Sequence, residues 1–293
     1  MTYPVRHVLA VQAELGECPL WSVQEQVLYF VDILAPAIHR FNPQTCQHEV
    51  FPVAEHIGCL GLRAGGGFVA ALRSGVCLMD TQGHITRWLA ENPDPSDKSR
   101  FNDGRVDPWG RFWCGNLWQP QDRNAAHLCR LDNQYHFRVM AGDIKISNGL
   151  AFSPDRRWMY HADTPNGVLY RYPLDNQGEP GAREVLRRFD ATGEGLPDGA
   201  AVDAEGYYWS ALYGAGKVIR IDPANGETVA TIALPVRWPT MVAFGGAALK
   251  TLYITSSRED RSVQDLTRYP QSGDLFAVDL PFAGLAESLF QDN

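Results

Sequence analysis

The sequence predicts an all-β fold, a six-bladed β-propeller of four-stranded antiparallel blades formed by residues 1–293 as a single domain. Three observations favour this fold. Short segments with an aromatic or apolar triplet begin at residues 27, 67, 110, 157, 206 and 251, and such intervals match the length of one propeller blade. Turn-forming residues follow many of the strand-like segments. No stretch shows the 3.6-residue apolar spacing of a helix over a helical length.

Each blade is predicted to repeat one order of strands. In the first blade, an inner strand ending in "PLW" precedes "VLYFVDI" (27–33), "AIHRFNP" (37–43) and the outer strand "HEVFPV" (48–53). Later blades continue from the segments "GFVAALR", "GRFWCGN", "RWMYHAD", "GYYWSAL" and "TLYITSS" into a third strand, and several show an outer strand such as "ITRWLA" or "HFRVMA". Closing the ring requires one more strand in the last blade. Residues 5–12 are the natural candidate, "ESLFQ" (287–291) competes, and the sequence leaves the choice open.

Composition and charge indicate which kinds of molecule the protein is expected to bind. A net charge of −8 and a pI near 5.5 disfavour nucleic acid and favour a small diffusible ligand. The N-terminus lacks a secretory leader pattern and no apolar run is long enough to span a membrane, so we expect a cytoplasmic protein with no membrane partner and no obligate protein partner. The six cysteines have no metal-site or disulfide spacing and are expected to be free and mostly buried.

The repeat predicts where polar side chains converge. Counting back 11 or 12 residues from the aromatic of each triplet reaches Glu17, Asn102, Asn148 and Asp198 in four of the six blades. Equivalent positions of inner strands face one central channel, and two converging carboxylates require compensation, most simply by a cation. Glu17, Asn148 and Asp198 would give three oxygen ligands with two negative charges, which suit Ca²⁺, Mg²⁺ or Mn²⁺ and also permit Zn²⁺ or Fe²⁺. The alternative is that Asn148 and Asp198, each followed by glycine, are only turn residues.

Other polar residues are assigned by position. Arg100 and Asn102 share one face of an extended segment and are candidates to bind a ligand above the ion. Several aspartates are expected to support the fold instead: Asp103 through loop amides, Asp32 and Asp163 by bonding across blades or bracing the channel, and Asp107, Asp155 and Asp203 as turn acids. Ser147 lacks the glycines of a nucleophile elbow, and no histidine belongs to a triad, so nucleophilic hydrolysis is disfavoured.

The segments "LGECPLW", "RFNDGRVDPWGRFWCG", "SNGLAFSPD", "LPDGAAVDAEGYYWSA" and "FGGAALKTLYITSSRE" resemble the gluconolactonase, senescence marker protein and regucalcin family across nearly the whole chain. The resemblance implies a propeller with one divalent cation held by Glu17, Asn148 and Asp198, substrate contacts from Arg100 and Asn102, and opening of sugar lactones. It also implies that Asp198 accepts the proton of the attacking water. The chain departs from the family pattern at "CGNLWQPQ" (114–121), which puts the sugar specificity in doubt.

The expected function is therefore that of a carboxylic-ester hydrolase. The cation would act as a Lewis acid in hydrolysis of an aldonolactone, such as gluconolactone or a pentonolactone, to the free sugar acid. The first alternatives are hydrolysis of an aldarolactone and a non-enzymatic calcium-binding regulatory propeller. Two further alternatives are a related propeller with another chemistry and a protein-interaction propeller. The sequence lacks the Trp-Asp strand endings that are usual in protein-interaction propellers, which disfavours the latter.

Overall fold

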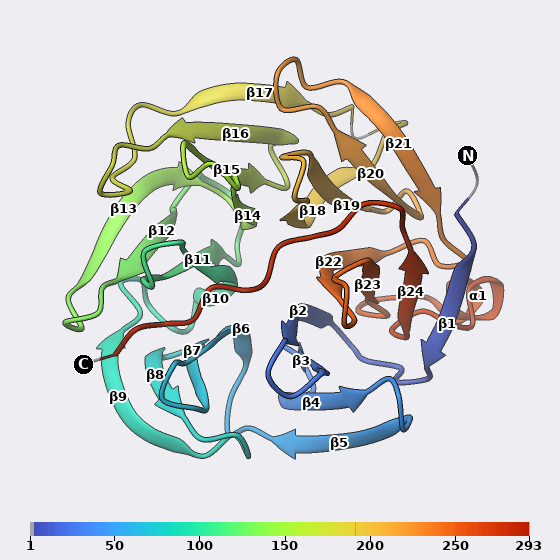
Figure 1. Cartoon of the computed structure of the whole chain (residues 1–293), viewed down its shortest axis with the longest axis horizontal. Coiled ribbons are helices and arrows are strands. Elements are labelled where there is room, and N and C mark those ends of the chain that lie inside the picture. The colour runs from blue at the N-terminus through green and yellow to red at the C-terminus, as the bar shows by residue number, and fades with distance from the viewer. Residues whose placement is uncertain (1–2, 191, 293) are drawn as a thin grey trace.

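Six four-stranded antiparallel sheets surround a central channel in the computed structural model, which describes residues 3–190 and 192–292 (Figure 1). This arrangement confirms the predicted six-bladed β-propeller. In the first five blades the strands run in chain order from the channel outward. The sixth blade takes its outer strand from the beginning of the chain.

The strands have these bounds. Blade 1 contains β2 (Gly16–Ser22), β3 (Val27–Asp32), β4 (Ala37–Asn42) and β5 (Gln47–Pro52), and blade 2 contains β6 (Ile57–Leu62), β7 (Phe68–Leu72), β8 (Gly75–Met79) and β9 (Ile85–Glu91). Blade 3 contains β10 (Ser99–Val106), β11 (Phe112–Trp118), β12 (Ala126–Leu131) and β13 (Phe137–Ile144), and blade 4 contains β14 (Ser147–Phe152), β15 (Trp158–Asp163), β16 (Val168–Pro173) and β17 (Glu184–Arg188). Blade 5 contains β18 (Leu196–Val202), β19 (Tyr208–Tyr213), β20 (Lys217–Ile221) and β21 (Thr228–Ala233). Blade 6 contains β22 (Pro239–Gly245), β23 (Thr251–Ser256), β24 (Leu275–Asp279) and β1 (Val5–Leu9).

The helix α1 (Val263–Arg268) lies in the long connection between β23 and β24. Ser262 caps its N-terminus, and the Ser262 side chain accepts a hydrogen bond from the backbone N–H of Asp265. With only six residues, α1 is too short to cross a membrane, and no other helix in the described chain could do so.

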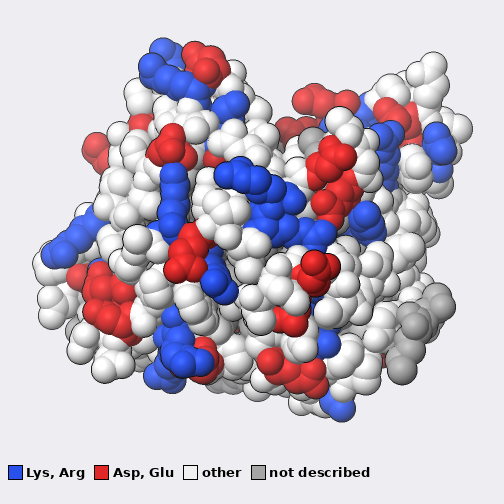
Figure 2. Space-filling view, turned by 90° about the horizontal axis from the view of Figure 1, so that it is seen from above, with Lys and Arg blue, Asp and Glu red and all other residues white. Residues whose placement is uncertain are grey.

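Burial follows the distance of a strand from the channel. The inner strands β2, β14 and β22 are buried along their whole length, whereas the outer strands β5, β13 and β17 have several exposed residues. Inner strands are covered on both faces because neighbouring blades pack against them, which explains their apolar composition. Figure 2 shows the edge of the ring that includes β17 and β21, where acidic and basic side chains are interspersed.

The expected turn acids hold the turn between the first two strands of their blades. Asp107 accepts hydrogen bonds from the backbone N–H of Trp109 and Arg111, both at 2.9 Å, and Asp203 accepts from Glu205 and Tyr207, both at 3.0 Å. In two blades the second carboxylate oxygen accepts the indole N–H of the next strand, at 2.8 Å from Trp113 to Asp107 and 2.9 Å from Trp209 to Asp203. These buried acids are satisfied by local partners, as the sequence predicted.

Asp32 and Asp163 have the predicted supporting role, but in the described structure they bond within their own blades and not across blades. Asp32 accepts hydrogen bonds from the backbone N–H of Glu14 and Leu15, and Asp163 accepts from Lys145 and Ile146. Both aspartates therefore fix the segment that leads into the inner strand of their own blade.

The pairing of β1 shows which segment completes the sixth blade and closes the ring. β1 pairs antiparallel with β24, with Val5 opposite Val278 and His7 opposite Phe276. Residues 287–291 do not extend a blade. They belong to a C-terminal segment, residues 281–292, that crosses one mouth of the channel (Figure 1). Its buried Phe290 forms an isolated bridge with Arg63 at blade 2.

The cysteines are free, with five buried and Cys46 exposed, which confirms the expectation of free, mostly buried thiols.

Candidate active site

A register shift occurs near the start of every inner strand, which the repeat did not predict. The shifts fall between Glu17 and Leu20, Ile57 and Cys59, Phe101 and Gly104, Asn148 and Ala151, Pro197 and Ala200, and Pro239 and Val242. A bulge bends the strand and turns the side chains beside it. The six bulges lie at one level of the ring, where the predicted site residues also lie.

A cavity of about 270 Å³ lies at this level, and all five predicted site residues line it: Glu17, Arg100, Asn102, Asn148 and Asp198. The inner strands begin here and end at the opposite mouth, which the C-terminal segment crosses. The five residues that the sequence register predicted to converge thus line one cavity, although the register gave no account of the loops around them. The loop residues and remaining walls are Leu15, Leu117, Gln121, Ile146, Thr164, Tyr213, Glu259, Asp260 and Arg261.

Glu17 and Asp198 form the acidic centre of the cavity. Each residue is 6% exposed. Burial raises the pKa of both carboxyl groups well above the usual range, and the charge of Asp103 raises that of Glu17 further while the charge of Glu17 raises that of Asp198. Neither carboxylate forms an ion pair with another described residue. The site therefore holds two acids that are unstable as neighbouring anions unless a cation or protons compensate them.

A chain of hydrogen bonds fixes the amide groups beside this acidic centre. Arg100 Nη1 donates to Asn102 Oδ1 at 2.8 Å, and Asn102 Nδ2 donates to Asn148 Oδ1 at 2.9 Å. Asn148 Nδ2 donates to Thr164 Oγ1 at 2.8 Å, and the Thr164 hydroxyl donates to the carbonyl of Pro197 at 2.7 Å. Each of the two amide oxygens accepts one hydrogen bond and keeps a second lone pair, whereas Asn102 Nδ2 also donates to the carbonyl of Ser147 at 3.0 Å and so has no N–H group left.

Arg100 is buried without an ion-pair partner among the described residues. Its Nη1 also donates to the Phe101 carbonyl at 3.0 Å, and burial lowers the pKa of the guanidinium to about 10. Its Nε and Nη2 make no hydrogen bond within the described chain, so they are available to a ligand. Asp103 accepts from the backbone N–H of Gly104 at 2.7 Å and of Leu150 at 2.9 Å, so it satisfies backbone amides as predicted, although these amides belong to β10 and β14 and not to a loop.

The donor chemistry of the cavity fits one divalent cation. Within residues 3–190 and 192–292 no group of three or more His, Cys, Asp or Glu side chains is placed to hold a metal ion, so the third donor would be the Asn148 amide oxygen. Four carboxylates and two guanidiniums line the cavity, and their ionised forms leave two negative charges. Oxygen donors with this charge are typical of hard divalent cations.

Ser147 and His161 lie beside this site but face into the blade. Ser147 Oγ and His161 Nε2 are 2.8 Å apart, and both residues are buried. His161 Nδ1 has no hydrogen-bond partner in the described structure, so the pair lacks the acid of a catalytic triad. Its inaccessibility agrees with the sequence-based argument against serine hydrolysis.

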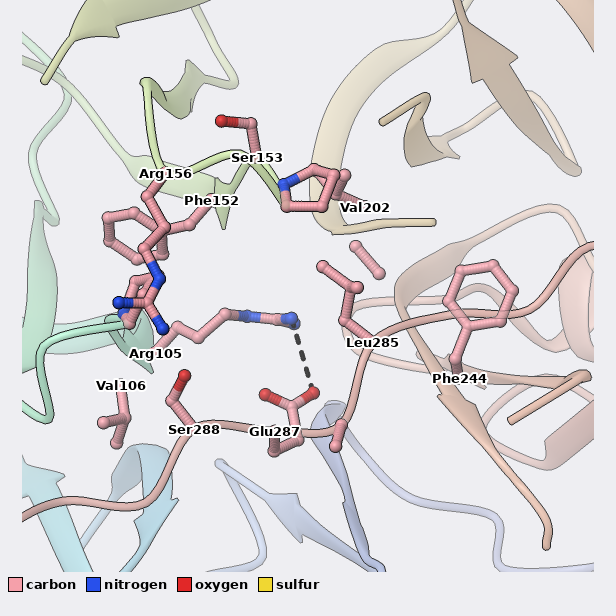
Figure 3. A pocket seen from close by; sticks show the side chains of 14 residues that line it. Arg105, Val106, Phe152, Ser153, Arg156, Val202, Phe244, Leu285, Glu287 and Ser288 are labelled. Atoms are coloured by element: carbon pink, nitrogen blue, oxygen red, sulfur yellow. Dashed lines mark hydrogen bonds and ion pairs between the residues drawn. The ribbon is translucent and has the colours of Figure 1, made fainter. Parts of the chain in front are cut away.

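A second cavity, of about 210 Å³, lies at the opposite mouth against the C-terminal segment (Figure 3). Arg105 points into it and pairs with Glu287 at 3.4 Å, and Arg105 Nη2 donates to the Ala200 carbonyl at 3.0 Å. Its other labelled walls include Phe152, Val202 and Phe244. This cavity has a single carboxylate that is already paired, so it offers no comparable cation site.

Comparison with known proteins gives four related findings. Residues 15–258 match the family model described as SMP-30/Gluconolactonase/LRE-like region. The chain is 55% identical to a 6-deoxy-6-sulfogluconolactonase of Pseudomonas putida over 290 residues, which cover 99% of both chains. It is 32% identical to regucalcin of Xenopus laevis over 97% of both chains. A solved structure of a calcium-binding protein, regucalcin, from Agrobacterium tumefaciens matches with a TM-score of 0.91 and 29% identity, covering 99% of this chain and 98% of that one.

Proposed function

The chain belongs to the SMP-30/gluconolactonase/LRE-like family, and from this premise we propose that it hydrolyses a sugar lactone to the free sugar acid with the help of one divalent cation. The observation that carries the proposal is the convergence of Glu17, Asn148 and Asp198 with Arg100 in one cavity. The relative that shares 55% of its residues favours a gluconolactone with a sulfonate at C6 as the substrate.

Glu17, Asn148 and Asp198 would hold the cation through carboxylate and amide oxygens. When bound, it would supply Lewis-acid polarisation of the lactone carbonyl and stabilise negative charge on that oxygen. The pKa values of Glu17 and Asp198 would fall beside such a charge, so both groups would be ionised at neutral pH.

Asp198 is the proposed proton acceptor. One of its oxygens would remain free to take a proton from the water molecule that attacks the carbonyl carbon. As the tetrahedral intermediate collapses, the bond from the carbonyl carbon to the ring oxygen breaks, and Asp198 returns the proton to that oxygen. The products are a carboxylic acid and a hydroxyl group, so no other reactant is needed.

Arg100 is proposed to orient the substrate. Its free Nε and Nη2 can donate to a ring hydroxyl or to the carbonyl oxygen, which holds the reacting carbon near Asp198. Both N–H groups of Asn102 already have protein acceptors, so Asn102 is proposed to donate to the substrate only by exchanging one of them. In the structure it aligns Arg100 and Asn148, so its contribution is mainly one of positioning.

The experiment measures acid release by pH-stat from gluconolactone, its C6-sulfonated analogue, a pentonolactone and an aldarolactone, with the water-only rate subtracted. We expect turnover that is lost on chelation and restored by at least one of Ca²⁺, Mg²⁺, Mn²⁺, Zn²⁺ or Fe²⁺. Asp198→Asn should lower kcat by about 10²- to 10⁴-fold. Full activity of the chelated protein, or of Asp198→Asn, would overturn the mechanism.

The second candidate is a calcium-binding propeller without enzymatic activity, favoured by the match to the Agrobacterium tumefaciens structure. It predicts Ca²⁺ binding at the same residues with no acid release above the water-only rate on any lactone. The same pH-stat panel, combined with calorimetric titration of Ca²⁺, separates the two functions.

A further inference from the structure

Arg261 is the second guanidinium of the candidate active site. It follows β23 in the connection to α1, on blade 6. Blade 6 lies between blade 5, which carries Asp198, and blade 1, which carries Glu17 (Figure 1). Arg261 is therefore placed on the wall that joins the two carboxylates, whereas Arg100 comes from blade 3.

The guanidinium of Arg261 is held in place by neutral partners. It lies over the ring of Trp238, with Cζ 4.4 Å from the ring centroid. Its Nη2 donates to the hydroxyl of Tyr213 at 3.0 Å, and its Nε donates to the backbone carbonyl of Glu259. Stacking and two hydrogen bonds fix the plane of the group without neutralising its charge.

No carboxylate among residues 3–190 and 192–292 forms an ion pair with Arg261, although two acids, Glu259 and Asp260, precede it directly and also line the cavity. A guanidinium has five N–H groups, and only two of those on Arg261 have a described partner. Three donors of an oriented cation thus remain for a ligand in the cavity.

Resting on the proposed lactone hydrolysis, we propose that Arg261 binds an anionic group at C6 of the lactone, and that a sulfonate is the anion it selects. A planar fork of N–H donors matches the oxygens of a sulfonate, carboxylate or phosphate. The neutral hydroxymethyl group of gluconolactone needs no such cation, so Arg261 determines specificity and takes no part in bond breaking.

Two acids next to Arg261 would increase the selectivity for a sulfonate over other anions. Glu259 and Asp260 repel anions at longer range, so an anion gains only where it reaches the N–H groups of Arg261 directly. A sulfonate carries one negative charge and a phosphate ester carries nearly two at neutral pH. We therefore expect the sulfonated lactone to be preferred over the 6-phosphorylated one.

The test compares kcat/KM on four substrates: gluconolactone, its C6-sulfonated analogue, 6-phosphogluconolactone and a glucarolactone with a C6 carboxylate. The variants are Arg261→Gln, Arg261→Lys and Tyr213→Phe. The matched control is Arg258→Gln, because Arg258 lies in the same connection but outside the cavity, where it donates to Gln12.

Arg261→Gln should lower kcat/KM for the sulfonated lactone by about 10- to 100-fold, chiefly through KM, and should change the value for gluconolactone by less than about threefold. Arg261→Lys should retain part of the preference, because it keeps the charge and loses the fork. Tyr213→Phe should raise KM for the anionic substrates only, since Tyr213 positions Arg261. Arg258→Gln should behave as the wild type.

Two outcomes would overturn the inference without touching the hydrolytic function: gluconolactone turned over by the wild type as well as its sulfonated analogue, or an equal loss on both substrates in Arg261→Gln. A preference for the 6-phosphate or the C6 carboxylate would overturn the choice of sulfonate. Failure of the wild type on all four lactones would instead count against the proposed function itself.

Discussion

Glu17 and Asp198 would be two buried negative charges that no neighbouring side chain of the described protein neutralises. Both carboxylates are almost fully buried, and neither has an ion-pair partner in the described chain. An uncompensated buried charge costs several kcal/mol. The register of the repeat predicted that these two residues would meet, because equivalent positions of inner strands share one level of the channel. It could not predict their burial, which depends on loops that have no place in the repeat.

Glu17→Gln should stabilise the metal-free protein and weaken its function. The amide keeps the shape of the side chain and removes its charge, so the metal-free protein should melt at a higher temperature at pH 8 than the wild type. Affinity for the activating cation and kcat/KM should each fall by at least about 100-fold. Thermal unfolding in chelator, calorimetric titration of the cation and pH-stat measure the three quantities. Unchanged cation affinity would remove Glu17 from the ligand set.

His161 should make the protein sensitive to acid. Burial, with the charge of Arg183 as a smaller cause, lowers the pKa of His161 from 6.5 to about 3. Between these values the unfolded chain binds a proton that the folded chain does not, so stability falls as the pH decreases through this window, by up to about 1.4 kcal/mol per pH unit.

The corresponding variant is His161→Gln, which keeps a hydrogen-bonding group near Ser147 and cannot titrate. Its free energy of unfolding, measured by urea titration at several values between pH 7 and pH 4.5, should decline less steeply than that of the wild type. His39→Gln is a useful comparison, because burial also lowers the pKa of His39, to about 4. A parallel decline in wild type and His161→Gln would contradict the assignment.

At the scale of the elements, the bulges interrupt the regular pairing of the inner strands at the level of the candidate active site. Asn148 pairs with Ala162, and the next ladder pair is Ala151 with Tyr160. Gly149 lies between them with φ +61°, and the carbonyl of Gly149 accepts a hydrogen bond of 2.7 Å from the hydroxyl of Tyr208 in blade 5. The glycine of this "NG" pair is required by the bulge and by the close approach of Tyr208.

Gly149→Ala should therefore be costly. A Cβ at this position would lie 2.3 Å from the Tyr208 hydroxyl oxygen, in a backbone conformation that disfavours side chains. We expect a loss of about 2 kcal/mol or more, a melting temperature lower by about 4 °C or more, and weaker cation binding because Asn148 moves. Gly142→Ala is the control, since its Cβ would make only ordinary contact with His127. Equal melting temperatures for the two variants would contradict this account.

The connections between elements were much harder to predict than the strands. Aspartates at fixed offsets identified the turns after the inner strands, because an Asx-type turn has a local sequence signal. Tyr213 is the last residue of a second strand, and Thr164 and Arg261 lie in the connections that follow second strands, where the blades differ in length and composition. The chemical nature of the proposed substrate end of the site depends on these loops, so the repeat predicted the candidate ion ligands and carried no signal for Arg261.

At the scale of the whole molecule, closure of the ring is the feature that sequence reasoning left open. Residues 5–12 and residues 287–291 were both apolar enough to serve as the last strand. The structure shows that β1 completes the sixth blade, because β1 pairs with β24 through backbone hydrogen bonds, whereas Phe290 packs at the mouth of the channel. The choice depends on contacts between residues about 270 positions apart, for which the local pattern carries no signal.

Removal of residues 1–9 should open the ring. The edge of β24 would lose its ladder partner, and an exposed edge favours pairing with other chains. We propose that the ring unfolds as a single cooperative domain, so the truncated protein should show one transition lowered by about 5 °C or more and a larger oligomeric fraction in size-exclusion chromatography. Arg6→Gln, which removes only the exposed ion pair with Asp279, should lower the melting temperature by about 1 to 3 °C at most. An unchanged melting temperature after truncation would show that β1 does not close the ring.

The pairing of β1 with β24 also fixes the order in which the protein can be completed during synthesis. β1 leaves the ribosome well before the strand that receives it, Leu275–Asp279. Blades 1 to 5 are each continuous in sequence and can form as they emerge, while β1 stays without its partner until β24 has been made. The sixth blade is therefore completed after the other five, and its last strand comes from the oldest part of the propeller.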